Sequence, residues 1–137
     1  MKLTSAIQVV CSALFCATVP FAYASQGNIA PSQCPSLSSI SATAYDSAEK
    51  SPAFPGMYYV MQTNHPYGTE NSWDFGILVK ATNESEAFAH AKSELSLYTS
   101  PRAPKPTGYG TWICEYLNPN GPEAVAFTPA HSADIPG

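Results

Sequence analysis

The sequence predicts an α+β fold in which a four-stranded antiparallel sheet packs on one main helix. Two apolar segments with strand-like patterning, 57–63 and 73–81, predict an antiparallel hairpin. A capped amphipathic stretch, 84–97, predicts the helix, and two more strand-like segments, 109–117 and 123–128, follow it. The element order ββαββ is typical of a two-layer α+β domain.

The first hairpin is predicted from its residue types. Aromatic and β-branched side chains fill the centre of 57–63, and 73–81 alternates apolar side chains with polar or small ones. The intervening segment 64–72 holds Asn, His, Pro, Gly and Ser, which are typical of turns. We therefore expect an exposed loop between the two strands.

The helix over 84–97 has the clearest local pattern. Asn83 can cap it, and Glu86 stands three residues later, as a capping box requires. Glu84 and Glu86 both favour the positive end of the helix dipole. Pro101 prevents any continuation.

The segment before the first strand is ambiguous. Four apolar residues recur at helical spacing and indicate a possible N-terminal helix over 36–49: Leu37, Ile40, Ala44 and Ala48. The many serines weaken this pattern because they compete for backbone hydrogen bonds. Segment 99–108 carries three prolines and is expected to be a stiff loop, and 118–122 is expected to be a turn.

The N-terminus has the pattern of a signal peptide. Lys2 precedes an apolar run over 7–21, and a small-x-small site ends at Ala24. This predicts a signal peptide over 1–24, cleavage between Ala24 and Ser25, and one exported domain over 25–137. The apolar run is too short and interrupted to span a membrane, and nothing later is long enough. The protein is therefore expected in the periplasm or outside the cell.

Cysteine usage predicts one disulfide. Cys11 and Cys16 leave with the signal peptide, which leaves Cys34 and Cys114 in an exported chain. Their pairing closes a loop of about 80 residues, which the chain-entropy model converts to about 4.5 kcal/mol of stability.

Charge and motifs disfavour several classes of function. After cleavage, five cations face ten carboxylates, a net charge of −5, and no basic stripe favours nucleic acid or an anionic membrane. The chain has no Gly-x-Ser-x-Gly, Ser-x-x-Lys, phosphate-binding glycine loop or Cys-x-x-Cys-His. His90, flanked by Glu86 and Glu94, is interpreted as part of a solvated helix face, and no metal site is expected. We expect a non-enzymatic binding protein, with a small hydrolase using carboxylates as a minor alternative.

The candidate ligand-binding residues are His65, Tyr67, Tyr59 and Met61. Imidazole and phenolate both ligate haem iron, and His65-Pro66-Tyr67 follows an aromatic strand. Met57, Tyr59 and Met61 share one face of that strand and could contact a flat apolar ligand. Arg102 and Lys105 could meet propionates. Haem is a possible cofactor on this interpretation, although an ordinary polar loop above a core strand explains the same residues.

Several stretches resemble a family of small exported bacterial proteins, described partly as haemin-binding proteins and partly as a domain of unknown function. They lie at 34–40, 67–75, 81–95, 112–116 and 124–129. The resemblance implies an exported, virulence-associated protein of an intracellular or host-associated bacterium, with haemin as a candidate ligand. It assigns no ligand residue. The alternative is a module that binds a host or periplasmic protein through the exposed loops 64–72 and 99–108.

Overall fold

The computed structural model describes residues 30–130 of the chain. The predicted signal peptide and its cleavage site between Ala24 and Ser25 lie outside this range. None of the helices within residues 30–130 is long and apolar enough to cross a bilayer.

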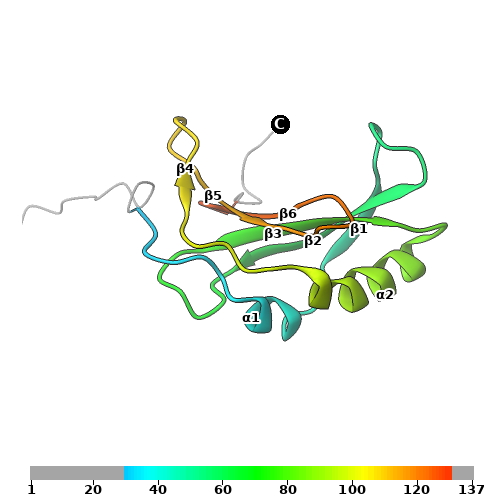
Figure 1. Cartoon of the computed structure of the whole chain (residues 1–137), viewed down its shortest axis with the longest axis horizontal. Helices are drawn as coiled ribbons and strands as arrows, with labels where there is room; N and C mark the ends of the chain where they lie inside the picture. The colour runs from blue at the N-terminus through cyan, green and yellow to red at the C-terminus, as the bar shows by residue number, and fades with distance from the viewer. Residues whose placement is uncertain (1–29, 131–137) are drawn as a thin grey trace, which may run out of the picture.

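The described chain folds into two helices, a short 3-10 turn and one six-stranded sheet (Figure 1). The helical elements are α1 (Leu37–Ser41), α2 (Glu84–Glu94) and η1 (Leu95–Leu97), which continues α2. The strands are β1 (Ser47–Lys50), β2 (Met57–His65), β3 (Trp73–Lys80), β4 (Lys105–Pro106), β5 (Trp112–Tyr116) and β6 (Ala124–Thr128). Their order is β1-β2-β3-β6-β5-β4, and every neighbouring pair is antiparallel.

The hydrophobic core lies between the sheet and the helices. Figure 1 shows α1 and α2 on the same side of the sheet. The side chains of Val60, Trp73, Phe75 and Tyr116 are fully buried there, together with Ile40 of α1. Phe75 and Tyr116 meet edge to face with ring centroids 5.7 Å apart, a favourable aromatic geometry.

The predicted α+β class, the main helix and the first antiparallel hairpin are confirmed, but the sheet has six strands instead of four. The possible helix over 36–49 is wrong beyond Ser41. Ala48 pairs with Val60 as part of β1, so hydrogen bonding to the free edge of β2 prevails over a weak helical pattern.

One of the two strands that the sequence did not predict, β4, lies inside the segment 99–108, which was predicted to be a loop. Lys105 and Pro106 pair with Ile113 and Trp112 of β5 at the end of the sheet. Proline has no N–H to donate, and an edge strand tolerates it because one side of the strand needs no donor. The proline content therefore predicted an irregular segment where a two-residue edge strand forms.

The start of α2 shows the predicted cap with one difference. The Asn83 side chain accepts a hydrogen bond of 2.9 Å from the backbone N–H of Glu86. The Glu86 carboxylate accepts from the backbone N–H and hydroxyl of Thr82, one residue before the cap. These bonds hold the pKa of Glu86 below its usual value. Both residues thus fix the entry into the helix.

The predicted disulfide between Cys34 and Cys114 is present, with Cα atoms 5.8 Å apart. It ties the segment before α1 to β5. Beside it, the Tyr116 hydroxyl donates to the backbone oxygen of Pro35 at 2.6 Å. The N-terminal segment is therefore attached to the sheet both covalently and by a buried hydrogen bond.

Candidate functional site

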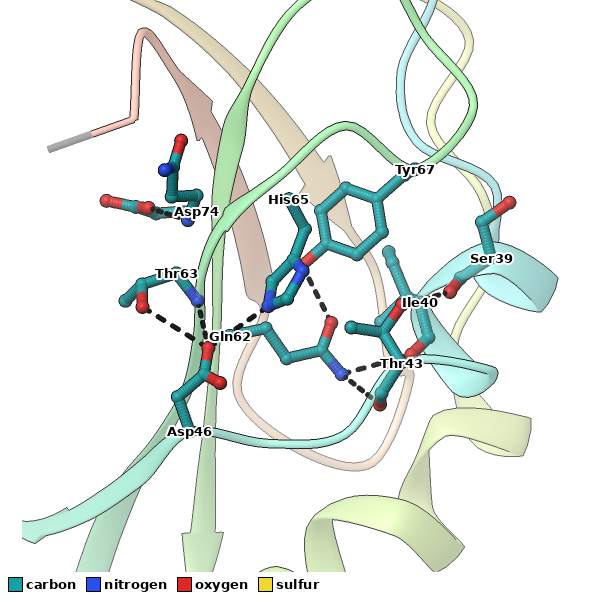
Figure 2. A network of polar contacts seen from close by, with 10 residues as sticks. Ser39, Ile40, Thr43, Asp46, Gln62, Thr63, His65, Tyr67 and Asp74 are labelled. Atoms are coloured by element: carbon teal, nitrogen blue, oxygen red, sulfur yellow. Dashed lines mark hydrogen bonds and ion pairs between the residues drawn. The ribbon is translucent and has the colours of Figure 1, made fainter. Parts of the chain in front are cut away.

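A buried glutamine organises the polar network at the end of β2 (Figure 2). Gln62 is 0% exposed. Its amide nitrogen donates to the backbone oxygens of Ile40 (3.0 Å) and Thr43 (2.8 Å), and its amide oxygen accepts from the Tyr67 hydroxyl at 2.7 Å. Because buried polar groups are costly without partners, this amide fixes the segment after α1 against β2.

Tyr67 completes this network from the β2–β3 loop. Tyr67 is 7% exposed. Its backbone φ is 46°, a value that residues other than glycine seldom adopt. Burial raises the pKa of its hydroxyl, which therefore remains a protonated hydrogen-bond donor. The Tyr67 side chain is thus committed to holding the loop.

Asp46 forms a second, more exposed cluster just before β1. Its carboxylate accepts from the backbone N–H of Thr63 at 2.6 Å, from the Thr63 hydroxyl at 3.2 Å, and lies 3.2 Å from Nε2 of His65. Although partial burial opposes it, these contacts hold the pKa of Asp46 below its usual value. The cluster fastens the start of β1 to the end of β2.

The register of β2 and β3 shifts between Gln62 and His65, so the strand carries an irregularity there. Asn64 has a φ of 59°, a conformation that asparagine tolerates better than most residues. Its N–H donates at 2.8 Å to the buried carboxylate of Asp74 on β3. This irregularity extends β2 to His65, two residues past the predicted end.

The structure separates the four candidate ligand residues into two pairs. The rings of His65 and Tyr67 lie 5.7 Å apart, but each has its own protein partner, Asp46 and the Gln62 amide respectively. Tyr59 and Met61 have the opposite strand parity to Gln62 and therefore lie on the other face of the sheet. The four do not form one site.

The other face of the sheet carries an apolar surface, which we call the open face. It consists of Met57, Tyr59, Met61, Leu78, Ile113, Val125 and Phe127. Among residues 30–130, both helices pack on the opposite side of the sheet. Leu78 is buried yet separate from the core cluster, and Tyr59 is 39% exposed. Glycine at position 76 leaves room for the Met61 sulfur, since a Cβ there would lie 2.7 Å from it.

Charged side chains border the open face, with Lys80 opposite Met57 at one corner. Glu49 lies opposite Tyr59 on β1, and Glu115 lies opposite Val125 on β5. Glu115 forms an ion pair of 2.7 Å with Lys105, which raises the pKa of that lysine. Lys105 is therefore engaged in an ion pair, whereas Arg102 lies exposed in the loop before β4.

A groove lies on the helical side of the sheet, between α2 and the segment after α1. Its volume is about 430 Å³, and its lining consists of Ser41, Ala42, Thr43, Ala44, Tyr45, Phe88, Lys92 and Leu95. Phe88, Lys92 and Leu95 stand at helical spacing and share one side of α2 and η1. The groove exists because small side chains at 41–44 do not fill the space beside the helix.

The walls of the groove are held in place by hydrogen bonds. The Thr43 oxygen accepts from Gln62, and the Tyr45 hydroxyl donates to the backbone oxygen of Ala91 at 3.2 Å. The Tyr45 ring lies 6.5 Å from that of Phe88, centroid to centroid. The groove is thus formed before any ligand arrives.

His90 has polar partners beside α2. Its Nδ1 lies 2.6 Å from the backbone oxygen of Lys80, and its Nε2 lies 3.7 Å from Glu86. Within residues 30–130, no group of three or more His, Cys, Asp or Glu side chains is arranged to hold a metal ion.

Sequence reasoning missed Gln62, Asp46 and the groove. Side chains alternate between the two faces of a strand, and Gln62 stands two residues after Val60 and four after Tyr58, which are both buried. The alternation therefore predicts that Gln62 also points into the core. Asp46 and the groove depend on the path of the chain after α1, for which the sequence had no clear pattern.

No family model, curated protein or solved structure matches this chain.

Proposed function

We propose that this protein is a non-enzymatic binding protein that works outside the cytoplasm and docks a protein partner on the open face. The observation that carries the proposal is the apolar character of that face, on which no helix packs within residues 30–130. The predicted signal peptide supports the location, and a disulfide fits an oxidising compartment.

The size of the open face suits a transient interface. Strands spaced about 4.8 Å apart, with same-face residues about 7 Å apart along each strand, give each side chain about 34 Å² of the face, so the seven apolar residues cover roughly 240 Å². Exposed apolar patches of a few hundred Å² on monomers are often functional. Two such patches bury roughly 480 Å² in total, well below the area of stable complexes, so we expect a weak or transient complex.

The edges of the sheet are poor docking sites by comparison. β4 has only two residues, one of them Pro106, and β1 has four, ending in Glu49 and Lys50. Short, charged or proline-bearing edges discourage strand addition. A partner is therefore expected to cover the face of the sheet.

The border charges define the chemistry of that partner. Glu49 and Glu115 flank the apolar centre, where Lys105 pairs with Glu115 and Lys80 lies opposite Met57, and the chain as a whole is acidic. Because complementary potentials favour association, the partner should present an apolar patch bordered by lysine or arginine. Raising the salt concentration should slow its association.

The experiment is a quantitative capture of partners from periplasmic extract and host lysate. Tyr59→Lys and Val125→Lys each place a charge in the apolar centre, and Ala53→Lys adds the same charge at an exposed connector position. A partner captured by the wild type and by Ala53→Lys, but lost from both open-face variants, supports the proposal. Retention of the same partners by the open-face variants refutes it.

Haemin is a second candidate ligand for the same face. The specific observation is that Tyr59 and Met61 stand two residues apart on the open face, with the Tyr59 ring partly exposed. A phenolate can ligate haem iron, and the family resemblance also supports haemin. A haemin titration followed in the Soret band should then saturate near one per chain and weaken in Tyr59→Phe but not in Tyr109→Phe. A titration indistinguishable from that of an unrelated acidic protein excludes it.

A further inference from the structure

We propose that the groove between α2 and residues 41–45 is a separate binding site for a small amphipathic monoanion with a hydrocarbon or aromatic body and a carboxylate head. This site lies on the helical side of the sheet and involves none of the residues of the open face. The groove therefore does not overlap the surface proposed for the protein partner.

The body of the ligand is defined by the apolar lining. Ala42 and Ala44 line one side of the groove, and Phe88 and Leu95 line the other. The volume of about 430 Å³ lies in the usual range for small-molecule pockets, which is about 300–1,000 Å³. The methyl groups and the rings of Tyr45 and Phe88 offer no buried charge, so the part of the ligand between them must be apolar.

The head group is defined by Lys92. It is the one charged residue in the lining of the groove. None of the ion pairs in the described part of the chain involves it, although the protein is acidic overall. An ammonium beside an apolar groove attracts an anion through charge-assisted hydrogen bonds. The hydroxyl of Ser41, also in the lining, can add a donor to the same head group.

The rigidity of the walls favours binding of a small ligand. Gln62 holds Thr43, the Tyr45 hydroxyl holds the α2 backbone, and the N–H of Asp46 donates to the Met61 oxygen at 2.7 Å. A wall that is already ordered loses little conformational entropy when the ligand binds. The same network that appeared as the polar centre of Figure 2 thus supports one side of this groove.

Glu94 acts electrostatically on the Tyr45 hydroxyl, whose pKa is raised mainly by burial. That hydroxyl is turned to the backbone oxygen of Ala91, so it does not supply the head-group contact. Because Lys92 is the one cation among the described residues that line the groove, a single carboxylate is expected to bind, and a dianion is expected to bind no better than a monoanion.

The experiment uses decanoate and its methyl ester as probes of the folded, oxidised protein. Binding is followed by amide chemical shifts in two-dimensional NMR and by calorimetry. Decanoate should shift the amides of residues 41–45 and 88–95 and saturate, and the ester should bind about fivefold more weakly because it lacks the charge. Shifts scattered over the surface, or equal affinities for acid and ester, overturn the proposal.

Three variants separate the groove from general anion binding. Lys92→Gln should weaken decanoate about fivefold without changing the ester, whereas Lys80→Gln, an exposed cation at the end of β3, should change neither. Ala44→Phe should fill the groove and abolish both, and because Ala44 is exposed the fold should persist. Unchanged binding in Lys92→Gln or in folded Ala44→Phe refutes the site.

Discussion

Replacing Tyr67 with phenylalanine removes one hydroxyl from the interior and leaves the rest of the side chain in place. That hydroxyl is the donor to the Gln62 amide oxygen, 2.7 Å away, and Gln62 is 0% exposed. The variant therefore leaves a buried acceptor without its partner while the packing is unchanged. Such an orphaned group costs about 1–3 kcal/mol in the free energy of unfolding.

This cost is large enough to measure. Domains of this size are stable by about 5–15 kcal/mol, and 1 kcal/mol shifts the melting temperature by about 4–8 °C. Urea denaturation at pH 7 should show a lower midpoint with an unchanged slope, because the surface exposed on unfolding is the same. Tyr109→Phe is the matched control, since the Tyr109 side chain is 92% exposed and the change should cost less than about 0.5 kcal/mol.

A double-mutant cycle tests the origin of the effect. Gln62→Leu also removes the donor to the Thr43 oxygen, so it should destabilise more than Tyr67→Phe. In the combined variant the two losses should be less than additive, because the Gln62–Tyr67 bond can be lost only once. If Tyr67→Phe matches the Tyr109→Phe control, or if the two losses simply add, the reasoning about this network is refuted.

Three further predictions follow from contacts described above. Replacing Cys34 and Cys114 together with serine should lower the free energy of unfolding by about 4.5 kcal/mol in a denaturant titration, from the loop of 80 residues that the bond closes, and a loss below about 1 kcal/mol would contradict this. Asn83→Ala should cost about 1 kcal/mol and speed amide exchange in the first turn of α2, and unchanged exchange there would disprove the cap. The pKa of Asp46 is held below its usual value of 3.8, so the stability from its carboxylate is present above that pH and is lost as pH falls through the lowered pKa. Asp46→Asn should therefore be less stable than wild type at pH 7 and lose less stability on acidification, and parallel pH profiles of the two proteins would count against the cluster.

The elements that could be predicted from the sequence are those with strong local patterns. Asn83 and Glu86 mark the start of α2, and the apolar segments of β2 and β3 mark the hairpin, because capping and strand patterning act between near neighbours. The disulfide was predictable because only two cysteines follow the predicted signal peptide. These features depend little on the rest of the fold.

The features that sequence missed depend on distant contacts. Ala44 and Ala48 fit a helical stripe, and only the free edge of β2 draws Ala48 into a strand. Tyr67 was interpreted as a candidate ligand because its residue type suits haem, but its hydroxyl meets Gln62 only when the loop turns back through an unusual φ. The residue type shows which interactions a side chain can make, whereas the fold determines which of those partners lies within reach.

The strand order has a consequence for how the chain is completed as it is synthesised. Within residues 30–130, β6 is the last strand along the chain, yet it lies between β3 and β5 in the sheet. Until it emerges, the β1-β2-β3 meander and the β4–β5 hairpin have no strand between them, and the edges of β3 and β5 remain unpaired. Contacts between segments far apart in sequence close a sheet slowly. The two parts of the sheet can therefore be joined only once β6 is available, because β6 is the strand that pairs with both β3 and β5.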